Sequence, residues 1–261
     1  MFKSSASALA MVLVAGCATT TNVSEAARSE LAPTGKLRAG MNLGNALFTT
    51  KDATTGEIRG VSVDLMRELA SRLGVPVEFV VHASPGDVAD AADKGTWDVA
   101  VLAIVQARAQ TIAFSPAMTE IEATYVVHKD SVLRSVAQVD ATGIRITAPE
   151  KAGFELYLTQ TLRNATLIRT KGTMASMSLF NERRADALAG LKPDLLSFMD
   201  KMPEARMVDD NFMTVNHGLA TPRSRRAAAE YLKAFIEEIN ASGFVARSIV
   251  RNGVQGLSAV K

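Results

Sequence analysis

One apolar stretch near the middle of the chain constrains the fold more than any other. Val99–Ile104 is a run of six apolar residues that follows Thr96-Trp97-Asp98. A run of this length without polar alternation is typical of a strand that is buried on both faces, as in a parallel sheet covered by helices. A polar segment containing Arg108 comes next, and a second apolar group ends at Phe114-Ser115-Pro116. The sequence therefore predicts an α/β fold with this strand at its centre.

Arg108 follows the carboxyl end of this predicted strand. In open α/β sheets, ligands bind at that edge. A guanidinium group placed there can hold a carboxylate with two parallel, charge-assisted hydrogen bonds. Position alone is equally compatible with a solvated surface arginine, so both readings stay open at this point.

Strand and helix patterns alternate on both sides of the central stretch, which is typical of a parallel sheet with covering helices. In the first half, a helix is expected to begin at Asp64 and to end at Gly74. The strands expected in this half are Lys36–Met41, Val77–Val81 and Val99–Ile104.

The same alternation restarts after a strand expected at Ala123–Val127. The later strands are expected at Gly143–Thr147, Ala165–Arg169 and Ala185–Ala189, and the later helices at Phe154–Leu162, Met174–Asn181 and Pro193–Met199. A returning strand at Thr214–Ala220 then leads to a long amphipathic helix at Ala227–Ser242. The chain is therefore expected to form two similar α/β units in series, followed by a C-terminal segment.

Composition supports a globular protein and argues against nucleic-acid partners. The 261 residues are 48% hydrophobic and carry a formal net charge of +2. This length allows one large core or two smaller ones. Aromatic residues make up 5% of the chain, which is too few for a platform that stacks nucleic-acid bases.

The N-terminus has the pattern of a targeting segment. Lys3 precedes a short apolar stretch, Ala8–Val14, which is too short to span a bilayer. Val14-Ala15-Gly16-Cys17 follows, and small residues before a cysteine at this place resemble a bacterial lipoprotein signal. By that resemblance, residues 1–17 hold the signal and Cys17 becomes the lipidated first residue of the mature protein. An ordinary signal peptide cut near Ala18 is the alternative.

Cys17 is also the only cysteine of the chain, so it has no disulfide partner within it. A free thiol would be unusual in an oxidising compartment, which favours the lipidated form. Residues 18–34 are polar and rich in small residues without strong periodicity, and we expect them to form a tether.

Six segments in order resemble the extracytoplasmic solute-binding proteins of ABC transporters for polar amino acids, family 3. These segments are Gly35–Gly40, Gly56–Leu65 (GEIRGVSVDL), Leu73–Phe79 (LGVPVEF), Gly95–Val99 (GTWDV), Arg108 with Phe114-Ser115-Pro116, and Arg184–Leu188 (RADAL). The first three resemble the family's opening strand, its G-x-x-x-G-F-x-V-D-L segment and the turn and strand that follow. The fourth resembles its G-x-x-D-V piece, and the fifth its E-R-x-x-x-x-x-F-S-x-P block. The sixth resembles the R-x-D-A segment of its second lobe. The likeness extends from about Gly35 to Gly256.

The resemblance implies the type II periplasmic-binding-protein fold, with two α/β lobes joined by two crossover strands. Residues 35–124 and 216–261 would form the first lobe, and residues 125–215 the second. The ligand would bind in the cleft, and the cleft would close by a hinge motion. The implied function is that of a periplasmic, lipid-anchored protein that delivers a small carboxylate-bearing solute to the permease of an ABC transporter.

Three departures from the family bear on the ligand. Val105 takes the place of a usual threonine near the arginine, and the aromatic pair after the first strand is reduced to Asn45-Ala46-Leu47-Phe48. Leu191, followed by Lys192, stands where the family commonly has an aspartate that holds the ligand ammonium. Because an ammonium beside Lys192 without a carboxylate partner is unfavourable, the sequence favours an anionic ligand.

The binding site expected from these arguments includes residues of both lobes. Arg108 would hold the carboxylate, helped by the amide groups at the start of the helix that follows Ala152 and Gly153. Lys192 would add a second positive charge, while Glu120 or Glu122 either replaces the missing aspartate or is simply exposed. The full set of expected ligand-binding residues is Arg108, Asn42, Asn45, Ile104, Glu122, Ala152, Gly153, Leu191 and Lys192.

We expect neither catalysis nor a metal or other cofactor. The sequence has no nucleophile elbow, phosphate loop or H-E-x-x-H motif, and its three histidines are isolated from one another. Two alternatives stay open. One is a dehydratase-like periplasmic enzyme on the same fold, in which Glu122 or His217 would act as the general acid. The other is a ligand sensor that takes no part in transport.

Overall fold

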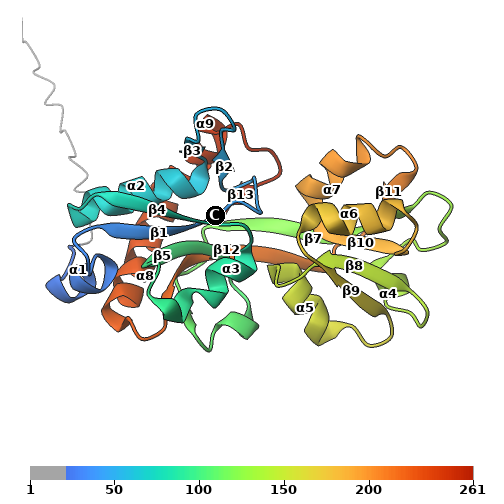
Figure 1. Ribbon diagram of the computed structural model, residues 1–261, viewed down its shortest axis with the longest axis horizontal. Coiled ribbons are helices and arrows are strands. Elements are labelled where there is room, and N and C mark those ends of the chain that lie inside the picture. The colour runs from blue at the N-terminus through green and yellow to red at the C-terminus, as the bar shows by residue number, and fades with distance from the viewer. Residues whose placement is uncertain (1–21, 261) are drawn as a thin grey trace, which may run out of the picture.

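The computed structural model describes residues 22–260, and all but two of their strands form one sheet along the length of the molecule (Figure 1). The strand order is β4 (Val77–His82), β1 (Leu37–Asn42), β5 (Val99–Ala103), β12 (Met213–Pro222), β7 (Thr119–His128), β10 (Ala187–Leu191), β8 (Arg145–Pro149) and β9 (Thr166–Thr170). β1 is parallel to β4 and β5, and β8 is parallel to β9 and β10, whereas β12 and β7 are antiparallel to their neighbours. Two parallel parts are therefore joined by an antiparallel pair. We call the part around β1 lobe 1 and the part around β8 lobe 2.

The predicted central strand is confirmed. All five residues of β5 are buried, and β5 lies between β1 and β12. Trp97, just before it, is fully buried, and its indole Nε1 donates a 2.9 Å hydrogen bond to the carbonyl of Val88. That bond fixes helix α3 (Pro85–Asp90) against the sheet.

Lobe 1 carries α2 (Val61–Leu73), α3, α8 (Arg226–Ala241) and α9 (Phe244–Arg251). α2 ends as predicted at Gly74, whose φ of 64° gives the left-handed conformation that favours glycine. The prediction that this helix begins at Asp64 is wrong, since it begins at Val61. The Asp64 carboxylate instead accepts hydrogen bonds from Ser248 and Arg251 of α9. α8 matches its predicted amphipathic pattern and packs on β12 and α9.

Lobe 2 carries α4 (Val136–Val139), α5 (Gly153–Thr161), α6 (Thr173–Asn181) and α7 (Lys192–Met199). The three longer helices and β9 lie within two residues of their predicted bounds. β8 and β10 begin two residues later than predicted. For β8 the reason is local, because Gly143 turns the chain at φ 87° and the Ile144 amide still closes that turn on the Ala141 carbonyl.

The two long strands β7 and β12 connect the lobes (Figure 1). Each was expected as a shorter strand, and each is ten residues long. They pair with one another in the middle of the molecule, with Val215 opposite Ile121. The short elements are β2 (Thr50–Lys51), β3 (Ile58–Arg59), β6 (Ile112–Phe114), β11 (Ala205–Met207), β13 (Ser258–Ala259) and the 3₁₀ turns η1 (Ala92–Lys94) and η2 (Gln106–Arg108).

The two lobes repeat one arginine–aspartate arrangement. In lobe 1, the Arg38 side chain donates to both oxygens of Asp98, at 3.0 and 2.7 Å, and the Arg38 amide donates to the same carboxylate. In lobe 2, Arg145 makes the same three bonds to Asp186. Each pair ties the first strand of a lobe to the turn before a neighbouring strand. This is the structural basis of the two similar sequence segments GTWDV and RADAL.

The segment expected to be a tether contains a helix, α1 (Glu25–Leu31). Ala27 and Leu31 are buried, and α1 packs against α8. The Glu30 carboxylate accepts from the backbone amide of Ala228, which secures the contact. The expectation missed this helix because only two of its residues are buried. Cys17 and the signal segment lie outside the described residues.

Candidate functional site

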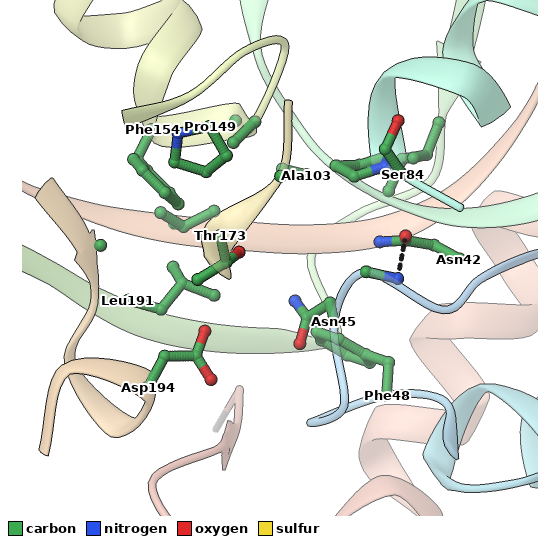
Figure 2. A pocket seen from close by; sticks show the side chains of 18 of the residues that line it. Asn42, Asn45, Phe48, Ser84, Ala103, Pro149, Phe154, Thr173, Leu191 and Asp194 are labelled. Carbon is green, nitrogen blue, oxygen red and sulfur yellow. Dashed lines mark hydrogen bonds between the residues drawn. The ribbon is translucent and has the colours of Figure 1, made fainter. Parts of the chain in front are cut away.

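A cavity of about 450 Å³ lies between the two lobes. Lobe 1 lines it with the loop after β1, the start of α3 and the end of β5. Lobe 2 lines it with the starts of α5, α6 and α7, and the crossover strand β12 contributes Val215 and His217. The volume falls within the range of pockets that hold small molecules. We call this space the cleft cavity (Figure 2).

Five of the residues expected from the sequence line the cleft cavity. They are Asn42, Asn45, Ala152, Gly153 and Leu191. The Asn42 and Asn45 side-chain oxygens accept hydrogen bonds from the amides of Gly44 and Leu47, respectively. These bonds fix the direction of both side chains in the loop after β1. Phe48, on the same loop, also lines the cavity.

Arg108 is not among the described residues that line the cavity. Only 5% of its surface is exposed. Its Nη1 donates to the Ala103 carbonyl at 3.1 Å, and its Nη2 donates to the Lys151 carbonyl of lobe 2 at 2.9 Å. Burial lowers the pKa of Arg108 to about 10, so the group is still charged at neutral pH. In this conformation its donors hold two backbone segments together.

Glu122 and Lys192 pair with each other. Their Oε2 and Nζ atoms are 2.6 Å apart, and both side chains are about half exposed. With Glu120 they line a separate hollow beside α7 and not the cleft cavity. The charges of Glu122 and Lys192, both expected to contact the ligand, thus neutralise one another. Ile104 is also absent from the described residues that line the cavity, and its amide donates to the Asn216 carbonyl at 2.8 Å.

Asp194 is a cavity residue that the sequence reasoning missed. It lies in the first turn of α7, three residues after Leu191, and it lines the cavity. Figure 2 shows its carboxylate turned toward the cavity, with the Asn45 amide on the other side. Among the described residues Asp194 has no hydrogen-bond or ion-pair partner, and burial raises its pKa to about 6. The direction of this side chain could have been predicted, because side chains in a helix tilt toward its N-terminus. In a helix that starts at Lys192, residue 194 therefore points back toward the end of β10.

The starts of three helices surround the lobe 2 side of the cavity. α5, α6 and α7 begin where β8, β9 and β10 end, and within residues 22–260 none of the three has a side-chain N-cap bond. The first amide groups of a helix have no partners within the helix, and they carry partial positive charge. These helix starts favour a negatively charged group, and the Asp194 carboxylate balances part of this positive charge at the start of α7.

His217 and Phe48 form part of the cavity wall on the side of lobe 1. Their ring centroids are 4.6 Å apart, and both residues are buried. Burial, together with the nearby charge of Arg108, lowers the pKa of His217 to about 3. The imidazole is therefore neutral at physiological pH and is not in the imidazolium form in which histidine usually acts as a general acid.

The other charges of the lining lie at its exposed margin. Asp87, Glu150 and Lys171 are all exposed to solvent, whereas Asp194 is partly buried. Residues 22–260 contain no group of three or more His, Cys, Asp or Glu side chains suited to a metal ion. In the same range, no helix is long and apolar enough to cross a membrane.

Fold and site together define a class: a two-lobed protein whose binding cavity lies between lobes linked by two crossover strands. Residues 37–251 match the bacterial extracellular solute-binding proteins, family 3, and the chain belongs to this family. The family and the type II periplasmic-binding-protein fold expected from the sequence are confirmed.

Known relatives agree with this assignment. The chain is 20% identical over 249 residues to the ABC transporter glutamine-binding protein GlnH of Bacillus subtilis (strain 168), covering 91% of this chain and 90% of that protein. The structure is similar to holo ArgBP from T. maritima (21% identity, TM-score 0.69, 84% of this chain and 96% of that chain). It is also similar to the L-arginine-bound amino acid ABC transporter substrate-binding protein AbpA from Streptococcus pneumoniae (20% identity, TM-score 0.72, 85% and 96%).

A third similar structure has a link to enzymes. It is the ancestral amino acid-binding protein AncCDT-1, described as a precursor of cyclohexadienyl dehydratase (21% identity, TM-score 0.70, 86% of this chain and 98% of that chain). At these identities the likeness establishes a shared fold. The identity of the ligand must therefore be argued from the residues of the cleft cavity.

Proposed function

We propose that this protein is a lipid-anchored extracytoplasmic solute-binding protein that delivers an amino acid to an ABC transporter. The observation that carries the proposal is Asp194, a partly buried carboxylate without a partner among the described residues, turned into a cavity that helix starts surround. A cationic group beside Asp194 relieves the cost of burying that charge. The partial positive charge of the helix starts suits a carboxylate.

A zwitterion satisfies both ends of this cavity at once. Its ammonium lies against Asp194, and its carboxylate faces the starts of α5 and α6, near Gly153 and Thr173. Apolar side chains such as Phe154 and Leu191 accommodate the rest of the ligand. This keeps the carboxylate-bearing solute expected from the sequence. It replaces the anionic ligand favoured by the sequence with a zwitterion, because Asp194, one helical turn after Leu191, offers an ammonium site. It also assigns the carboxylate to backbone amides instead of to direct contact with Arg108.

Matched ligand pairs test this proposal. Calorimetric titration compares an amino acid with the amine left by its decarboxylation and with the acid left by removal of its amino group. We expect binding of the amino acid alone, because each analogue leaves one charged end of the site without a partner. Equal binding of the amine would contradict the carboxylate site, and equal binding of the acid would contradict the Asp194 site.

The lipid anchor is a separate part of the proposal and depends on Cys17 alone. Metabolic labelling with palmitate compares the full-length protein with its Cys17→Ala variant. We expect label in the first and none in the second. Equal labelling of both would contradict the anchor, and a signal peptide cut near Ala18 would then be the better interpretation.

One observation favours a second candidate, a dehydratase-like enzyme on this fold. A carboxyl group whose pKa is raised to about 6 is partly protonated near neutral pH, as a general acid must be. Asp194 fits that role better than Glu122, which pairs with Lys192, or His217, which is neutral. Incubation with cyclic hydroxy acids and detection of the dehydrated product tests this candidate. Turnover that is lost in Asp194→Asn would support it over simple binding.

A further inference from the structure

Lys151 of lobe 2 contacts lobe 1 through both its backbone and its side chain. Its carbonyl accepts the 2.9 Å hydrogen bond from Arg108 Nη2, and its ammonium group forms an ion pair with Asp90 at the end of α3. The Lys151 backbone is held for these contacts, since its φ is 59° and its amide donates to Glu155 Oε2 at 2.8 Å. A lysine in the left-handed region is uncommon and costs conformational energy.

The lobes also approach each other closely at two glycines, Gly153 near Ala103 and Gly86 beside Lys151 itself. A Cβ atom added to Gly153 would lie 2.5 Å from the Cβ of Ala103, and one added to Gly86 would lie 2.7 Å from the Cβ of Lys151. Side chains at either position would hold the lobes apart. The contact between the lobes is therefore fitted closely around Lys151.

Arg108 takes part in this contact from inside lobe 1. It holds the carbonyl of Ala103 in its own lobe and that of Lys151 in the other, so rotation of lobe 2 away from lobe 1 breaks the second bond. A hydrogen bond from a buried, charged donor stabilises more than a neutral one. Opening thus removes a charge-assisted bond together with the Lys151–Asp90 ion pair.

We infer that Arg108, Lys151 and Asp90 form a latch that sets the balance between the closed and open forms of the protein, whether or not a ligand is bound. The three residues act on ligand affinity without contacting the ligand, because apparent affinity scales with the fraction of molecules in the competent form. Loss of the exposed Lys151–Asp90 pair lowers the closed-to-open ratio up to about fivefold. Loss of the Arg108 bond lowers that ratio about tenfold to a hundredfold.

Small-angle X-ray scattering of the full-length protein in detergent, without added ligand, tests the latch. Lys151→Asp places two carboxylates side by side, and aspartate tolerates a left-handed backbone better than most residues. We expect a larger radius of gyration for Lys151→Asp than for the wild type. The double variant Lys151→Asp with Asp90→Lys restores opposite charges and should return toward the wild-type value. Arg108→Met should also expand the protein.

The matched control is the ion pair between Lys36 and Glu78, which is as exposed as the Lys151–Asp90 pair and lies wholly within lobe 1. Lys36→Asp makes the same change of charge and should leave the radius of gyration unchanged. An unchanged radius in Lys151→Asp, or no recovery in the double variant, would overturn the inference even if Arg108→Met failed to fold. The test needs no ligand, so it stands apart from the proposed function.

Discussion

Replacing Asp194 with asparagine tests how this carboxylate recognises its ligand. The substitution keeps the shape of the side chain and removes its charge. Loss of a charged, desolvated partner typically costs ~2–5 kcal/mol, so we expect amino-acid affinity to fall about 30-fold to several thousandfold. Asp200→Asn, at the exposed end of the same helix, makes the same chemical change outside the cavity and should leave affinity unaltered.

The same substitution should stabilise the unliganded protein. Because the pKa of Asp194 is raised to about 6 in the folded protein, its contribution to stability is fully present below the unfolded value of about 3.9 and is lost as pH rises through 6. The loss is at most about 3 kcal/mol at pH 7.5. Asp194→Asn removes this loss, so its Tm should exceed that of the wild type by several degrees at pH 7.5 and by almost nothing at pH 4.

Binding should show the opposite dependence on pH. An ammonium ligand binds the ionised carboxylate, whose fraction rises about tenfold between pH 5 and pH 7. Calorimetry should therefore give about tenfold tighter binding at pH 7 in the wild type and a flat profile in Asp194→Asn. A variant that binds as tightly as the wild type, or that melts at a lower temperature at pH 7.5, would refute the reasoning.

Three further substitutions probe other parts of the structure. Gly153→Ala should weaken ligand binding without lowering Tm, because its new methyl group meets Ala103 only when the lobes close; titration and calorimetric melting together check this. Asp98→Ala should destabilise the fold by about 3–5 kcal/mol in a urea titration, since it removes a fully buried carboxylate and leaves two partly buried arginines without their partner, whereas Asp186→Ala, at the more exposed counterpart, should cost about 1 kcal/mol. Arg183→Gly should raise stability by up to about 1 kcal/mol, because Arg183 has a φ of 55° and its ion pair is exposed; an unchanged or lower urea midpoint would contradict the strain.

Most of the fold was predictable because hydrophobic periodicity is a local property. The uninterrupted apolar run at β5 and the spaced apolar face of α8 each mark one kind of element. The turn glycine at residue 74 fixed the end of α2 in the same way. The sequence did not predict α1, because a helix with only two buried residues shows almost no hydrophobic periodicity.

The cavity was predictable only where residues follow the end of a strand. Asn42 ends β1 and Leu191 ends β10, so sheet topology alone brings them to the cleft. The direction of the Arg108 side chain was not predictable, since one of the two carbonyl groups that accept from it, that of Lys151, lies 43 positions away in the sequence. The pairing of Glu122 with Lys192 likewise joins residues 70 positions apart.

The pairing of β7 with β12 has a mechanical consequence for the movement of the lobes. Two hydrogen-bonded strands form a ribbon that bends easily out of its own plane and resists bending within it, because in-plane bending compresses one strand and stretches the other. β13 adds a third strand to this ribbon at Glu120 and Thr119, which stiffens it on the side of lobe 1. We therefore expect opening to be a rotation about one axis, in which the Arg108–Lys151 bond and the Ala103–Gly153 contact part in a single movement.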